Sequence, residues 1–333
     1  MPPGLAIVSE QEGESMNRKL RNQLGIILLT VFLFAVLDFS IYQTFTKKVI
    51  PDTSPEMQAK SVEVSEYLPF REDSKIVKRR SEISLTGDLP VLDGAAALYP
   101  VFSAFVNAVY PEDSCIFQDG NFTPDSCLQM NNTRGAYQGV VDGTVDLVFC
   151  AGPSEQQLAY AREKGVELEL VPVGREAFVF LVNKDNPVSD LTVEQVQGIY
   201  SGIYQNWSEL GGEDERIAAL QRNEGSGSQT ALQKLMKGKK IVKDPDLFLG
   251  SAIGFSFRYY VEGIVSAGNV KMLSLNGVYP SKENIRNSRY PISNCFYAVY
   301  RKDNTNKNIP VLIRWILSEE GQQIIEESGY VGM

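Results

Sequence analysis

The residues with the clearest chemical potential lie together at residues 221–238, which read QRNEGSGSQTALQKLMKG. A polar turn that carries Arg222 leads into a small-residue loop and then into a segment with apolar residues at helical spacing. Ser226 is a favourable N-cap residue, so the next amides, those of Gly227 and Ser228, would point forward unpaired. Unpaired amides at the positive end of a helix dipole, hydroxyl groups and a guanidinium together make a site for a small anion. A flexible Gly-Ser turn before an ordinary capped helix is the alternative interpretation.

Two further segments are expected to begin helices with small or hydroxyl residues. One follows a short strand and starts at Ala96, Ala97 and Leu98, and the other starts at Thr133. In an α/β sheet, helix N-termini gather at the carboxyl ends of the strands, where ligands bind. Three such starts aimed at one point would hold a small oxyanion with backbone amides, hydroxyl groups and a bidentate Arg222.

The composition excludes several classes of function. The net charge of -9 argues against nucleic-acid binding, which requires a positive face. Histidine is absent, which removes Ser-His-Asp and Cys-His catalysis and every histidine-based metal site. A phosphoryl-transfer enzyme would need a Gly-rich loop with lysine and clustered metal-binding carboxylates, and neither is evident. We therefore expect a binding protein without catalytic activity, metal or cofactor.

The four cysteines fall into two pairs of different character. Cys115 and Cys127 flank a polar loop and are predicted to form a disulfide, if this part of the chain lies outside the cytoplasm. Cys150 and Cys295 each lie in an apolar, strand-like run and are interpreted as buried free thiols, with pairing across neighbouring strands left open.

The N-terminal part of the chain indicates a membrane anchor. Residues 24–43 are mostly apolar, with Asp38 as their single charge, and this run is long enough to span a bilayer. Residues 1–23 end in basic side chains and are predicted to lie in the cytoplasm. A secretory signal peptide is the alternative, but no small-x-small cleavage site follows the apolar run. Residues 44–82 are expected to form a linker or stalk outside the membrane.

From residue 83 the chain alternates between strand and helix patterns, which predicts a largely parallel sheet covered by helices. Separate strands are expected at residues 167–171 and 177–182, and one closing helix near the C-terminus. Because a strand pattern returns after residue 289, we expect a discontinuous lobe I (83–173 and 290–333) interrupted by lobe II (174–289). The cleft between the lobes is the expected ligand site.

Six segments carry a resemblance to a known family: DGAAALYPVFSAF, NNTRGAYQGVVDGTVDLVF, VPVGREAFVFLVN, LTVEQVQGIYSG, RNEGSGSQTAL and EEGQQIIEESGYV. Over residues 88–333 the chain resembles the phosphate-binding proteins of bacterial ABC importers, in a membrane-anchored branch. The resemblance implies a two-lobed type II periplasmic-binding-protein fold that closes on inorganic phosphate by hinge motion and delivers it to an ABC permease in the cell membrane. A sensor or interaction module of the cell envelope with the same fold is the alternative.

The resemblance also assigns the ligand contacts. The family's arginine corresponds to Arg222, its Ser-Gly-Thr run to Ser226, Gly227 and Ser228, and its helix-opening serine to Thr133. The first loop departs from the pattern, since residues 96–98 offer amides only.

The family's ligand-facing aspartate, which accepts a proton from phosphate, has no clear counterpart in this chain. Ser154 is nearest to that position in sequence, and Glu176 or Glu224 is a possible substitute. Arg175 and Glu176 are otherwise expected to form an ordinary ion pair at the hinge.

Overall fold

The computed structural model describes residues 62–242, 251–265 and 269–333. The chain divides into two compact units, Met1–Ser54 and Pro55–Met333, and every described residue belongs to the second. The predicted cytoplasmic tail (1–23) and membrane span (24–43) therefore lie outside the described residues. Within the described ranges, no helix combines the length and apolar character that a membrane crossing requires.

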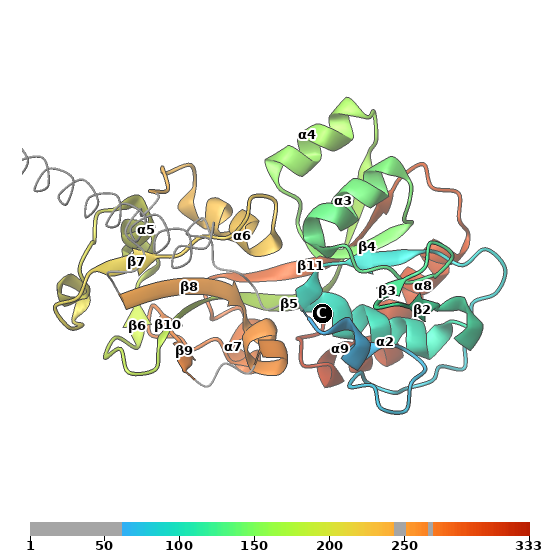
Figure 1. The fold of residues 1–333 in the computed structure, drawn as a ribbon, viewed down its shortest axis with the longest axis horizontal. Helices are drawn as coiled ribbons and strands as arrows, with labels where there is room; N and C mark the ends of the chain where they lie inside the picture. The colour runs from blue at the N-terminus through green and yellow to red at the C-terminus, as the bar shows by residue number, and fades with distance from the viewer. Residues whose placement is uncertain (1–61, 243–250, 266–268) are drawn as a thin grey trace, which may run out of the picture. The chain divides into compact units, whose positions relative to one another are not determined.

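One mixed sheet of seven strands runs through both lobes (Figure 1). Its strand order is β1 (Leu92–Gly94), β4 (Leu147–Ala151), β11 (Ser293–Arg301), β5 (Leu168–Asn183), β8 (Ser251–Phe257) and β7 (Ile217–Ala219), with β9 (Val270–Met272) also paired to β5. The pairs β1–β4 and β7–β8 are parallel, whereas β5 and β11 run antiparallel to their neighbours. The prediction of a largely parallel sheet is therefore wrong. The two central strands, β5 and β11, are antiparallel to each other and to their other neighbours.

Strand β5 is one continuous strand where two were expected. Its first part pairs with β11 and its second part with β8 and β9. The register with β11 shifts so that Phe296 faces Gly174 while Tyr297 faces Pro172. Pro172 therefore lies at an irregularity in the ladder, where a residue without an N–H is tolerated and the strand need not end.

Lobe I packs helices on both faces of its strands. Helices α2 (Tyr99–Val109) and α9 (Glu319–Glu327) lie on one side, and α3 (Asn132–Asp142) and α4 (Glu155–Glu163) on the other (Figure 1). Every residue of α2 is buried, as expected for a helix that is apolar nearly all round. The expected closing helix is two helices, α8 (Asn308–Ile316) and α9, because the chain turns at Leu317 and Ser318.

Residues 62–82 belong to lobe I, although they were expected to be part of a stalk. The short 3-10 helix η1 (Val64–Tyr67) packs on α2, and the Tyr67 and Ile76 side chains are buried in the lobe I core. The Ser103 hydroxyl donates to the Tyr67 carbonyl at 2.5 Å, and the Arg80 guanidinium donates to the Asn107 carbonyl at 2.7 Å. The mixed-charge composition of the segment did not predict these contacts.

Lobe II has its own core, drawn mainly from residues 177–290. Helices α5 (Val193–Ser201) and α6 (Gly227–Met236) lie on one side of its strands, and α7 (Lys282–Arg286) on the other (Figure 1). A second, two-stranded parallel sheet joins β6 (Asp190–Leu191) to β10 (Ser274–Leu275). The core is rich in aromatic rings, with Phe178 in contact with both Phe180 and Phe255.

The predicted Cys115–Cys127 disulfide is wrong, because both residues are free thiols in the structure. The loop between them is closed instead by a hairpin, β2 (Phe117–Gln118) with β3 (Asn121–Phe122), and by the Cys127 amide donating to the Ser114 carbonyl at 2.8 Å. Burial raises the pKa of the Cys115 thiol to about 12 and that of Cys127 to about 11. Cys150 and Cys295 are also free thiols, as interpreted from the sequence, but only Cys150 is buried, whereas Cys295 is partly exposed.

Candidate anion-binding site

The start of helix α6 carries the first group of anion donors. Ser226 is its N-cap, and its hydroxyl accepts from the Gln229 amide at 3.2 Å, as predicted. This cap satisfies the third amide of the helix and leaves those of Gly227 and Ser228 directed out of the first turn. The buried Gln229 side chain in turn accepts from the Arg222 amide at 2.9 Å, which fixes the loop that carries the arginine.

The start of helix α3 carries the second group. Its N-cap residue, Asn131, makes no side-chain cap, because its amide group donates to the Asp93 carboxylate at 2.8 Å. Asp93 also accepts from the Asn131 and Gly94 amides at 2.8 and 2.7 Å, so one carboxylate joins the end of β1 to the start of α3. Burial raises the pKa of Asp93, although these three donors oppose that rise. Thr133, in the first turn of α3, is 7% exposed.

The loop at residues 96–98 was expected to offer three backbone amides to a ligand, and one of the three is not available. The segment Ala96–Leu98 is a short 3-10 helix (η2) that precedes α2 and has no side-chain cap. The Leu98 amide donates to the Ala95 carbonyl at 2.8 Å, so it is occupied within the turn. The amides of Ala96 and Ala97 are therefore the groups that this loop can offer to a ligand, while the Leu98 side chain is buried.

These elements meet at one cleft of about 480 Å³ between the lobes. Of the predicted ligand residues, its lining includes Ala96, Ala97, Thr133, Arg222, Glu224, Ser226, Gly227 and Ser228. The two helix starts from opposite lobes are close: a Cβ placed on Gly227 would lie 3.2 Å from the Thr133 Oγ1 atom. Glycine is therefore the residue that lets α6 approach α3 this closely.

Two hydrogen bonds join helices α4 and α6 to the opposite lobe. The Gln157 side chain in lobe I donates to the Gly225 carbonyl at 3.4 Å, and Lys234 in lobe II donates to the Gly152 carbonyl at 3.2 Å. Each bond joins a helix of one lobe to a loop of the other.

Charge in the cleft favours an anion. No hydrogen bond or ion pair to another described residue engages the Arg222 guanidinium, and burial lowers its pKa because desolvation disfavours the charged form. The neighbouring Tyr260 side chain opposes this decrease in the pKa of Arg222. A second guanidinium, Arg134, also lines the cleft and packs near Gly225. Arg134 was not predicted as a site residue, although its place after Thr133 at a helix start was a usable signal.

Two of the three residues considered as substitutes for the missing aspartate are engaged elsewhere. Ser154 is the N-cap of α4 and forms a capping box with Gln157, and it lies outside the lining of this cleft. Glu224 is at the rim, where both carboxylate oxygens accept from the Gln233 side chain at 2.9 and 3.0 Å.

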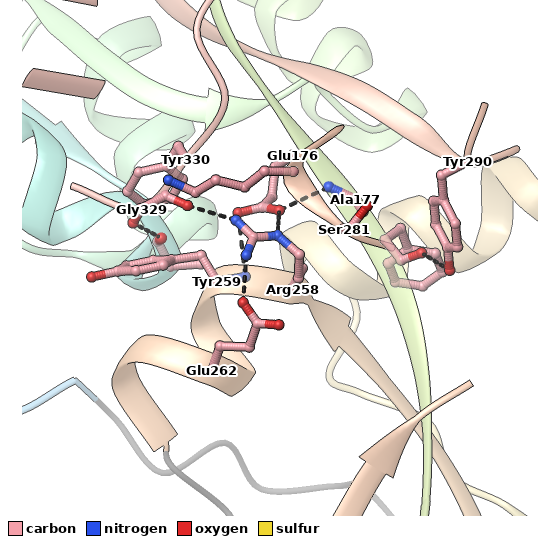
Figure 2. Close-up of polar contacts among 12 residues, drawn as sticks. Glu176, Ala177, Arg258, Tyr259, Glu262, Ser281, Tyr290, Gly329 and Tyr330 are labelled. Carbon is pink, nitrogen blue, oxygen red and sulfur yellow. Dashed lines mark hydrogen bonds and ion pairs between the residues drawn. The ribbon is translucent and has the colours of Figure 1, made fainter. Parts of the chain in front are cut away.

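Glu176, the third, belongs to a buried ion pair where β5 passes between the lobes (Figure 2). Its carboxylate lies 3.4 Å from Arg258 Nε and accepts from the Ala177 and Tyr259 amides at 2.9 and 3.3 Å. Burial outweighs the arginine's attraction and raises the pKa of Glu176 to about 7. The predicted pairing of Arg175 with Glu176 is wrong, because neighbouring strand residues point to opposite faces.

The same arginine connects strand β5 to the end of helix α9. The Arg258 guanidinium also pairs with Glu262 and donates to the Gly329 carbonyl at 2.6 Å (Figure 2). The next residue, Tyr330, packs against Tyr259 with the two rings tilted by 50°, and donates its hydroxyl to the Ala97 carbonyl at 2.5 Å. The ion pair of Glu176 and Arg258 is thus linked by direct contacts to the loop that lines the anion cleft.

The arrangement is suited to binding an oxyanion. It offers amides, hydroxyl groups and two guanidinium groups around one cavity, which are the donors that hold an oxyanion. Within the described ranges, no group of three or more acidic or cysteine side chains is placed to hold a metal ion.

A mixed sheet shared by two lobes, with helix starts directed into the cleft between them, defines a class of two-lobed binding proteins. The chain belongs to the PBP superfamily domain family, whose family model matches residues 92–320.

Among individual proteins, the chain is similar to the phosphate-binding protein PstS of Borreliella burgdorferi, at 26% identity over 61% of this chain and 81% of that protein. It is also similar to the phosphate-binding protein PstS of Bacillus subtilis, at 25% identity over 76% of this chain and 83% of that protein. The fold resembles a phosphate ABC transporter substrate-binding protein from Clostridium perfringens with bound phosphate. That similarity has a TM-score of 0.56 and 23% identity and covers 73% of this chain and 98% of the other.

Proposed function

We propose that this protein is a non-enzymatic solute-binding protein that captures inorganic phosphate, or a similar tetrahedral oxyanion, and delivers it to an ABC permease. The observation that carries the proposal is the meeting of Arg222 with the first turns of α3 and α6, which come from opposite lobes, in one cleft. The similarity to phosphate-binding proteins from two bacteria supports phosphate as the ligand.

Each element has a distinct role in the proposed complex. Arg222 forms two parallel hydrogen bonds with ligand oxygens, and the amides of Gly227 and Ser228 bind a third position. Thr133 contributes its hydroxyl from the other lobe, together with the amides of Ala96 and Ala97. Ligand contacts from both lobes stabilise the closed arrangement, because each lobe then binds the same ion.

The lobes are proposed to comprise residues 83–173 with 290–333 and residues 174–289, and residues 62–82 extend the first. They close about β5 and β11, the strands that pass between them.

Residues 24–43 are proposed to anchor the protein in the cell membrane, with residues 1–23 in the cytoplasm and the binding domain outside. The support is the apolar run itself and the basic residues that precede it. Such an anchor would keep the binding domain next to its permease. Protease treatment of intact cells tests this topology: the domain should be cleaved, and protection of the domain would overturn it.

Isothermal titration calorimetry with inorganic phosphate tests the proposed ligand. Arg222→Met should weaken binding by about 10- to 100-fold, because a charge-assisted hydrogen bond contributes about 1.5–3 kcal/mol. Arg314→Met, at an exposed position on α8, is the matched control and should bind as the wild type does. Absence of binding by the wild-type protein, or unchanged binding by Arg222→Met, would overturn the proposal.

A further inference from the structure

A small apolar pocket adjoins the anion cleft at the point where the helix starts meet. It has a volume of about 20 Å³ and shares Ala97, Thr133, Gly227 and Phe257 with the larger cleft. A cavity of this size holds one group about as large as a water molecule. Its lining includes residues of both lobes, such as Thr133 and Gly227.

Hydrocarbon makes up most of the wall of this pocket. Its apolar lining residues are Ala95, Ala97, Leu98, Ala151, Phe257 and Phe296. Ala151 ends strand β4, and its carbonyl accepts from the Tyr137 hydroxyl at 2.7 Å, so the strand end is fixed. The methyl side chain of Ala151 therefore forms part of the pocket wall at the end of β4, where it offers no hydrogen-bond acceptor.

The carboxylates that line the two cavities are engaged with the protein. Glu224 accepts from Gln233 at the rim, and Glu176 accepts from two backbone amides and pairs with Arg258. A hydroxyl group directed into the pocket thus meets mainly apolar side chains, and the uncharged polar residues in its lining are Thr133 and Asn294. An unpaired buried donor lowers affinity, whereas a methyl group there buries apolar surface at no such cost.

We propose, on the basis of the proposed function, that the cleft prefers a tetrahedral oxyanion with one short carbon substituent, an alkylphosphonate, over inorganic phosphate. Three oxygens bind the donors of the cleft, and the carbon occupies the pocket beside Ala151. The preference for methylphosphonate over phosphate should be at least about tenfold, which corresponds to about 1.4 kcal/mol.

Calorimetry with methylphosphonate, inorganic phosphate and sulfate, at one alkaline pH, tests the preference with the full chain. The wild-type protein should bind methylphosphonate most tightly. Ala151→Asp should reverse the order by placing an acceptor in the pocket, and Ala151→Val should abolish the advantage of methylphosphonate by filling it. The valine variant and the wild-type series keep the test decisive if the aspartate variant does not fold.

The outcomes separate the two proposals. Phosphate binding as tightly as methylphosphonate would overturn the alkylphosphonate preference and leave the proposed function intact. An unchanged order of affinities in Ala151→Val would also overturn the preference. Failure of all three anions to bind the wild-type protein would overturn the proposed function itself.

Discussion

Removal of the Arg258 guanidinium should destabilise the protein strongly and in a pH-dependent way. In Arg258→Met, Glu176 keeps its buried position but loses its cation, and the Gly329 carbonyl loses a donor. Breaking a buried pair by removing one partner costs about 3–5 kcal/mol. For a chain of this size that lowers the melting temperature by roughly 10 °C.

The pH dependence follows from the raised pKa of Glu176, about 7 in the folded protein against a usual 4.5. A carboxyl group whose pKa is raised by folding stabilises the protein fully below its unfolded pKa, and this contribution is lost as the pH rises through the folded value. Relative to Glu176→Gln, wild-type stability should therefore fall by about 3 kcal/mol between the two pKa values. The cost of Arg258→Met should be largest above pH 7, where the carboxylate is charged.

Urea unfolding followed by circular dichroism over a pH series measures these differences. Arg286→Met is the matched control, because its partner Glu326 lies at the surface and exposed pairs contribute about 0–1 kcal/mol. A stability difference between wild type and Glu176→Gln that is flat or rises with pH would refute the reasoning, since Glu176 would then stay ionised in the folded state.

Three further substitutions test the site and its rim. Gly227→Ala places a methyl group 3.2 Å from the Thr133 hydroxyl and should weaken phosphate binding at least several-fold in calorimetry; unchanged affinity would show that the helix starts need not approach closely. Ser154→Ala removes a helix cap and should lower the free energy of unfolding by about 1 kcal/mol while leaving phosphate affinity unchanged; weaker binding would contradict its assignment as a cap only. Lys234→Met removes the contact with Gly152 and should speed ligand release in stopped-flow measurements, whereas an unaltered rate would show that this contact does not hold the lobes.

Local signals in the sequence predicted the helix starts and the cap of the candidate site. Ser226 is a cap because its hydroxyl reaches an amide three residues away, an interaction that depends on neighbouring residues alone. The start of α3 near Thr133 and its end at Gly143, whose φ is 75°, are equally local. The cleft followed from these starts together with the fold that the resemblance implied.

Contacts between distant segments could not be predicted in this way. Glu176 and Arg258 are 82 residues apart, and no spacing rule connects them. The Leu98 amide donates to a carbonyl within a 3-10 turn, and a run of small residues does not predict such a turn. The cysteine spacing suggested a disulfide, but a hairpin closes the same loop through backbone hydrogen bonds. Residues 62–82 resemble a linker in composition because only a few of their side chains are buried.

The place of β11 in the sheet has a consequence for how the chain is made. Strand β11 lies between β4 and β5, yet it is translated more than 100 residues after both. Until the ribosome has added it, β4 has an open edge, and the apolar side chains of Val148 and Phe149, fully buried in the finished protein, have an incomplete covering. The core of lobe II comes mainly from one continuous segment, so its formation does not depend on a strand that is translated much later. The nascent chain therefore presents a half-built, aggregation-prone lobe I throughout the synthesis of lobe II.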